Sequence, residues 1–70
     1  MNKVEKRKRI GTILMVYRIS QLLARKEVAD VLDCTEEEIT IMENGEVSAL
    51  GLLEQYINLL GAKGKTGGLT

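Results

Sequence analysis

The stretch DVLDCTEEEITIMENG, Asp30 to Gly45, decides the fold because it carries signals for both ends of a short helix. Thr35 and Glu38 have the spacing of a capping box, in which the hydroxyl accepts from a backbone amide of the first turn and the carboxylate reaches back to the amide of Thr35. Asn44 and Gly45 tolerate the left-handed conformation that a helix terminus needs. The stretch therefore predicts a helix between these signals, with Ile39 and Met42 on its apolar side.

Three more helices are predicted around this one from helical spacing of apolar residues. The first runs from about Lys3 to Ser20, with Asn2 as its cap and an apolar side of Ile10, Ile13, Leu14 and Tyr17. A short second helix begins near Arg25 and breaks around Asp33 and Cys34. The last runs from about Ala49 to Leu60, and its apolar band consists of Leu50, Leu53, Ile57 and Leu60 with Leu52, Tyr56 and Leu59 beside them. This band is broader than one core face requires.

Length and composition predict one small helical domain. The chain has 70 residues, 44% of them apolar, only two aromatic residues and no proline. A chain of this size is near the lower limit for folding without disulfides, metal or a partner chain, so a homodimer is expected. We expect a basic N-terminal arm or helix start over residues 1–9, a helical domain over residues 10–61, and a flexible Gly-rich tail over residues 62–70.

Several classes of function are disfavoured by the residues that are scarce or missing. Cys34 is the only cysteine and the chain has no histidine, which excludes an internal disulfide and the usual zinc ligand sets. No nucleophile and base pair is evident, so we expect neither an enzyme nor a cofactor. No span of about 18 apolar residues occurs, and a cytoplasmic protein without a membrane segment is the expectation.

The formal net charge of zero hides a separation of the charges along the chain. Basic residues crowd the N-terminus, at Lys3 and at Lys6 to Arg9. From Glu27 to Glu54 there are nine acidic residues and no basic one. Such asymmetry bears on the partners of a protein rather than on its fold.

A set of spaced residues between positions 10 and 61 resembles the helix-turn-helix domains of phage-repressor and Xre type. The residues that carry the resemblance are Ile10-Gly11, Leu23, Arg25, Val28-Ala29, Leu32, Asp33-Cys34-Thr35, Ile39 and Glu43-Asn44-Gly45. The resemblance implies an all-α fold: a compact, lambda-repressor-like bundle of four to five short helices containing a helix-turn-helix. It also implies an ion pair between Arg18 and Glu43.

For function, the resemblance implies a small transcriptional regulator or repressor, encoded by a phage or mobile element, that binds operator DNA as a homodimer. The residues matching the DNA-contacting positions of the family are Arg25, Lys26, Thr35, Glu36, Glu37, Thr40 and Ile41. Phosphate contacts would come from the basic N-terminus, at Lys6, Arg7, Lys8 and Arg9.

The acidic charge of the same region favours a different class of function. DNA is a polyanion, so the glutamates of the third helix are also typical of an antirepressor or DNA-mimic module that binds a basic protein surface. The interface expected for that module comprises Glu36, Glu37, Glu38, Glu46, Leu52 and Tyr56. Sequence alone leaves both functions open.

Overall fold

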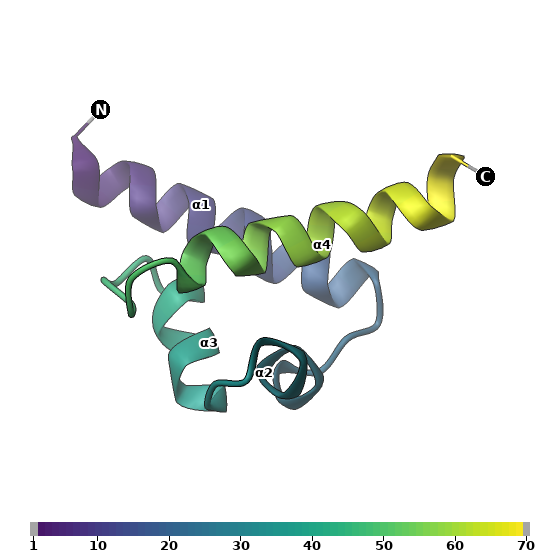
Figure 1. The fold of residues 1–70 in the computed structure, drawn as a ribbon. Coiled ribbons are helices and arrows are strands. Elements are labelled where there is room, and N and C mark those ends of the chain that lie inside the picture. Colours follow the sequence, from purple (N-terminus) through teal and green to yellow (C-terminus); the bar gives the residue numbers. More distant parts are fainter. Residues whose placement is uncertain (1, 70) are drawn as a thin grey trace.

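Four helices form the part of the chain that the computed structural model describes, which is the backbone of residues 2–69 and the side chains of residues 2–61. They are α1 (Lys3–Ser20), α2 (Arg25–Leu32), α3 (Glu36–Glu43) and α4 (Leu52–Leu69) (Figure 1). No strand occurs among the described residues. The predicted all-α class is confirmed.

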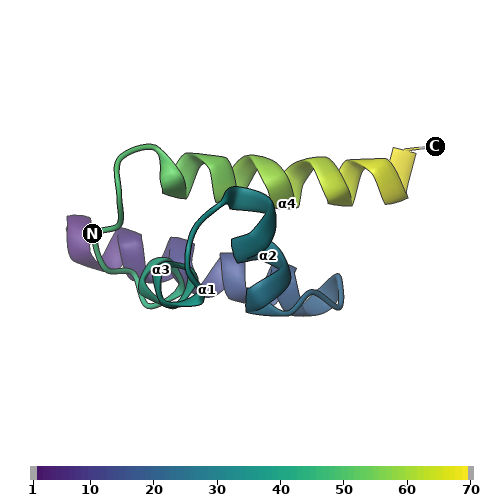
Figure 2. The ribbon, with the colours of Figure 1, turned by 60° about the horizontal axis from the view of Figure 1, so that its bottom comes forward.

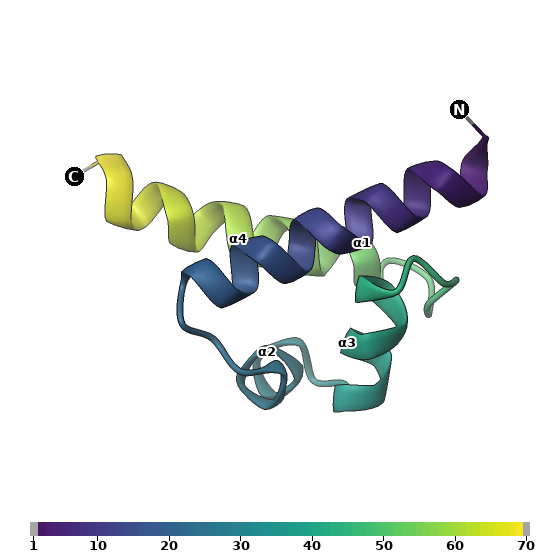
Figure 3. The same ribbon diagram turned by 180° about the vertical axis from the view of Figure 1, so that it is seen from behind.

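The two long helices α1 and α4 cross each other as one layer, and the two short helices lie together on one side of it (Figures 1 and 3). Seen more from the side of the short helices, α4 and α1 run along opposite edges of the molecule with α2 between them (Figure 2). The short helices therefore have one face toward the layer and another face toward solvent.

Local signals set the ends of the first three helices, and the predicted bounds are confirmed for α1 and α2. Asn2 Oδ1 accepts from the backbone N–H of Glu5 at 2.9 Å and begins α1. Left-handed Asp33, with a φ of 57°, ends α2, and the N–H of Cys34 then donates to the Ala29 carbonyl at 2.9 Å. Thr35 accepts from the N–H of Glu38 at 3.2 Å, which is one half of the predicted capping box. A turn of three residues therefore joins α2 to α3.

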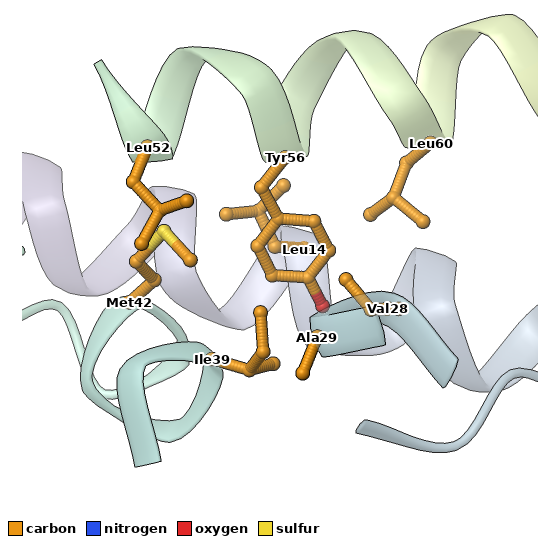
Figure 4. Packing of buried hydrophobic residues seen from close by; sticks show 8 residues of the cluster. All are labelled: Leu14, Val28, Ala29, Ile39, Met42, Leu52, Tyr56 and Leu60. Carbon is orange, nitrogen blue, oxygen red and sulfur yellow. The ribbon is translucent and has the colours of Figure 1, made fainter. Parts of the chain in front are cut away.

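The hydrophobic core lies between the α1–α4 layer and the two short helices, and every helix contributes to it (Figure 4). Tyr56 and Ile39 are completely buried at its centre. The buried apolar residues are Leu14, Val28, Ala29, Ile39, Met42, Leu52, Tyr56 and Leu60. Ile39 and Met42 thus form the inner side of α3, as predicted.

The inner face of α1 differs from the prediction. Its buried residues are Gly11, Leu14 and Arg18, whereas Ile10, Ile13 and Tyr17 are exposed to a third or more of their surface. Gly11 has no side chain, and a Cβ there would lie 2.5 Å from the backbone carbonyl oxygen of Glu43. Relative to the prediction, α1 is rotated about its axis. This orientation places Gly11 against the end of α3 and Arg18 in the interior.

The bounds of α4 also differ from the prediction. The helix begins at Leu52 and not at Ala49, because Gly51 has a φ of 80° that an α-helix cannot contain. Leu50 therefore lies outside the helix and is fully exposed. The predicted end at Leu60 is wrong: the helix continues to Leu69, and no proline interrupts it. The flexibility expected for residues 62–70 stays a prediction, and Thr70 lies outside the described residues.

At the end of α3, only one of the two predicted left-handed residues has that conformation. Gly45 has a φ of 79°, whereas Asn44 keeps a right-handed helical backbone. A Cβ on Gly45 would lie 2.6 Å from the Cα of Lys8. Gly11 and Gly45 therefore let α1 approach the carboxyl end of α3 closely.

We predict that Gly11→Ala lowers the free energy of unfolding by about 1–3 kcal/mol, because the added methyl group must displace backbone atoms of α3. Urea denaturation followed by circular dichroism measures the change. Gly61→Ala is the matched control: it also replaces a helical glycine, but its Cβ meets nothing within 4 Å. The control should gain about 0.5–1 kcal/mol from helix propensity. Equal effects of the two substitutions would contradict the close approach.

Candidate nucleic-acid interface

A buried carboxylate at the end of α3 connects all four helices. Arg18 of α1 donates from Nε to Glu43 Oε2 at 2.6 Å and from Nη2 to Oε1 at 3.2 Å. Arg25 of α2 donates to Oε1 at 3.1 Å, and the Tyr56 hydroxyl of α4 donates to Oε2 at 2.6 Å. The Glu43 side chain is only 1% exposed, and each of its oxygens accepts two hydrogen bonds. The ion pair that the resemblance implies between Arg18 and Glu43 is present.

The charge states of this network follow from its hydrogen bonds. Burial by itself raises the pKa of Glu43, but hydrogen bonds from Arg18, Tyr56 and Arg25 outweigh burial and lower that pKa. The hydrogen bond to Glu43 raises the pKa of Arg18. Burial, followed by the hydrogen bond to Glu43, raises the pKa of Tyr56. The network is thus an anion with two cations and a neutral phenol, and it positions α3 against α1, α2 and α4.

The outer side of α3 carries the residues that the resemblance places at DNA. Thr35, Glu36 and Glu37 are exposed, and Thr40 and Ile41 are half-buried. The Thr40 hydroxyl donates to the Glu36 carbonyl at 3.2 Å, so it has a partner within the helix. Thr35 immediately precedes α3 and the other four residues lie in its first two turns, and none of the five belongs to the buried core. Their exposed parts are able to contact a large partner.

Arg25 and Lys26, the two basic residues predicted to contact DNA from α2, differ in their surroundings. Arg25 is held by Glu43 through its Nε, and its side chain remains 40% exposed. It therefore has a structural role that the sequence did not indicate, and only part of its guanidinium faces outward. Lys26 is exposed at the first turn of α2.

The basic N-terminus lies beside the other end of α3. Arg7 donates from Nε to the Gly45 carbonyl oxygen at 3.3 Å, and Lys8 packs next to the same glycine. Glu36 and Glu37 are at the opposite end of α3, which is about 12 Å long. The structure therefore does not bring Lys6, Arg7, Lys8 and Arg9 together with the first turn of α3, and it uses Arg7 to satisfy the carboxyl end of that helix.

The alternative protein interface is corrected in part. Leu52 and Tyr56 were expected at that surface, but both are core residues, so they are unable to contact a partner. Leu52, Tyr56 and Leu60 are four residues apart, so they share one side of α4, and that side faces the core. Glu36, Glu37 and Glu46 are exposed, and Glu38 is half-buried.

Sequence reasoning missed the part that Tyr56 plays in the network. Tyr56 was read as a member of an apolar stripe, although a buried tyrosine hydroxyl usually needs a hydrogen-bond partner. Glu43, for which the resemblance implied an ion pair with Arg18, was available as that partner. Combining these two facts is the signal that would have placed Tyr56 beside Glu43.

Among the described residues, no group of three or more histidine, cysteine, aspartate or glutamate side chains is arranged to hold a metal ion. Within the same part of the chain, every helix is too short or too polar to cross a membrane.

Cys34 packs partly against the core, as a small apolar residue does. Burial together with the charges of Glu38 and Asp33 raises the pKa of its thiol.

Comparison of the chain with family models, curated proteins and solved structures found no match.

We predict that Tyr56→Phe lowers the free energy of unfolding by about 1.5–3 kcal/mol, because it removes a hydrogen bond to a buried charge while keeping the aromatic ring. Thermal or urea denaturation measures the loss. Tyr17→Phe is the matched control, since that ring is 55% exposed, and it should change stability by less than about 0.5 kcal/mol. Similar losses in both variants would argue against the Tyr56 contact.

A second prediction concerns pH. Because folding lowers the pKa of Glu43, the stability it contributes is present above its ordinary pKa of 4.5 and is lost as the pH falls through the lower pKa of the folded state. Tyr56→Phe removes one cause of that lowering. The difference in unfolding free energy between wild type and Tyr56→Phe should therefore shrink between about pH 7 and pH 3. Urea titrations at several pH values test this, and a difference that stays constant would refute it.

Proposed function

We propose that the chain is a small transcriptional regulator that binds double-stranded DNA through a helix-turn-helix formed by α2 and α3. One observation carries the proposal: two short helices joined by the three-residue turn Asp33 to Thr35 are held from behind by the core and by Glu43, while the outer side of the second is open to solvent. A helix of this kind fits the major groove of B-DNA when its first turns face the bases.

In this proposal the exposed residues of α3 read base edges. Glu36 or Glu37 accepts a hydrogen bond from the N4 amino group of cytosine, and Ile41 packs against a thymine methyl group. The Thr35 hydroxyl caps α3 and so sets the orientation of its first turn. The Glu43 network supports base recognition because it holds α3 in place against the three other helices.

Phosphate contacts in this proposal come first from the start of α2. Lys26 is exposed there, and the outward part of Arg25 adds to it. The basic turns of α1 would contact phosphates only at the far end of α3, near Gly45. Few cations thus lie near the first turn of α3, and we expect weak binding per copy with a shallow dependence on salt.

A second candidate function is favoured by one specific observation, the charge of the same face. Glu27, Asp30, Asp33, Glu36 and Glu37 are all exposed along α2, the turn and α3. This surface suits a module that binds the basic, DNA-contacting surface of another regulator. The two candidates share a location and differ in the charge of the partner.

The double substitution E36Q/E37Q separates the two candidates because it changes affinity in opposite directions. If DNA is the partner, removing two negative charges near the phosphates should tighten binding to a random-sequence duplex about fivefold at low salt. If a basic protein is the partner, the same change should weaken that complex. Fluorescence anisotropy of a labelled duplex, with salt raised from low to physiological concentration, measures the first effect.

Two controls accompany this measurement. Lys26→Ala should weaken DNA binding and reduce the salt slope by about 1, as expected for the loss of one phosphate contact. Asn58→Ala, an exposed and uncharged position on α4, should leave binding unchanged. Absence of binding by the wild-type chain even at low salt would reject the DNA proposal and leave the acidic face as a protein-binding surface.

A further inference from the structure

An apolar groove of about 260 Å³ runs between α1 and α4 on the outside of their layer. Leu14 and Leu60 of the core form its floor. Its walls are apolar side chains left half in solvent: Ile13 is 49% exposed, Tyr17 is 55% exposed and Ile57 is 43% exposed. Val16 and Ile19 of α1 are also exposed, beyond one edge of the groove. Clustered exposed apolar side chains of this kind mark an interaction surface.

The chemistry of the groove argues against a charged partner. Between Ile10 and Ser20 the only charged residue of α1 is Arg18, which is buried, and residues 55–61 of α4 contain no charged residue. DNA and anionic membranes attract proteins through cations placed on the contacting face. Among the described residues that line the groove there is no cation, which favours an occupant with an apolar and uncharged surface.

We propose that a second copy of this chain occupies the groove, so that the α1–α4 layers of two copies pack against each other around a two-fold axis. Such an interface is isologous and needs only a surface complementary to itself, which an uncharged apolar face provides. The small core of the chain fits this assembly, because domains of this size commonly gain stability by burying apolar surface against a partner.

The remaining charges of the chain suit this arrangement. The acidic residues of α2 and α3 lie on the other side of the layer, so the dimer keeps the two acidic surfaces far apart (Figure 1). With the two α1 helices antiparallel, the basic turns at Lys6 to Arg9 lie at opposite ends of the interface. Like charges are thereby separated at both places, which lowers repulsion.

The α2–α3 units lie on the outer sides of the two layers, so they face in opposite directions in the dimer. The assembly itself does not depend on DNA binding, so it is tested on the protein alone.

Sedimentation velocity of the full chain from about 1 μM to about 500 μM, without DNA, is the test. The wild-type chain should shift from the mass of one copy to that of two as concentration rises. Ile13→Glu introduces a charge into the groove and should raise the concentration for half association at least about tenfold. Val31→Glu is the matched control: it also replaces an exposed β-branched residue with glutamate, but on α2, and should leave the association unchanged.

Circular dichroism shows whether both variants keep the helical fold, which is expected because Ile13 is 49% exposed and Val31 is 62% exposed. A wild-type chain that stays monomeric over the whole range would overturn the proposal. Binding of that monomer to vesicles containing phosphatidylglycerol would then identify the groove as a membrane-binding surface and would not rescue the proposal. Equal weakening by Ile13→Glu and Val31→Glu would also overturn it, because the interface would then lie elsewhere.

Discussion

The Glu43 carboxylate is the constraint on which the rest of the structure depends. A buried charge is tolerated only when nearby donors replace the water that it loses, and here three other helices each supply a donor. Removing Glu43 or Arg18 alone would strand the other charge at a cost of about 3–5 kcal/mol, a large share of the stability of a small domain. One side chain therefore ties α1, α2 and α4 to the end of α3, in addition to the apolar core that all four helices share.

The same constraint explains which face of α1 is inside. A helix presents a single stripe to the core, and Arg18 must be part of that stripe to reach Glu43. Gly11 and Leu14 follow at helical spacing, so Ile10, Ile13 and Tyr17 are turned toward the outer edge of the helix. The spacing of apolar residues predicted that Ile10, Ile13 and Tyr17 face the core. Such spacing gives no weight to a buried ion pair or to a close approach of two backbones. The groove on the outside of the layer is the direct result.

The sequence was sufficient to predict the ends of helices where the signals are local. Asn2, Thr35 and Gly45 act within one turn of the helix that they begin or end, and the helices they delimit were predicted closely. The start of α4 was missed because Gly51, whose left-handed conformation excludes Ala49 and Leu50 from the helix, was not read as a stop signal. The pairing of Arg18 with Glu43 came from the resemblance, whereas the contacts of Arg25 and Tyr56 with the same carboxylate join residues 18 and 13 positions away and have no local signature.

The proposed DNA-reading surface and the proposed dimer surface constrain each other. Because Arg25 is partly committed to Glu43, a single copy has few free cations near the first turn of α3, and its affinity for DNA is expected to be low. A second copy raises the effective affinity only when both reading helices reach DNA at the same time. In a dimer joined at the α1–α4 groove the two α3 helices face opposite ways, so one straight duplex is unable to contact both. The second copy of such a dimer therefore raises the affinity for DNA only if the dimer binds two DNA segments at once. Glu36 and Glu37 of each copy would then contact the bases of a different segment.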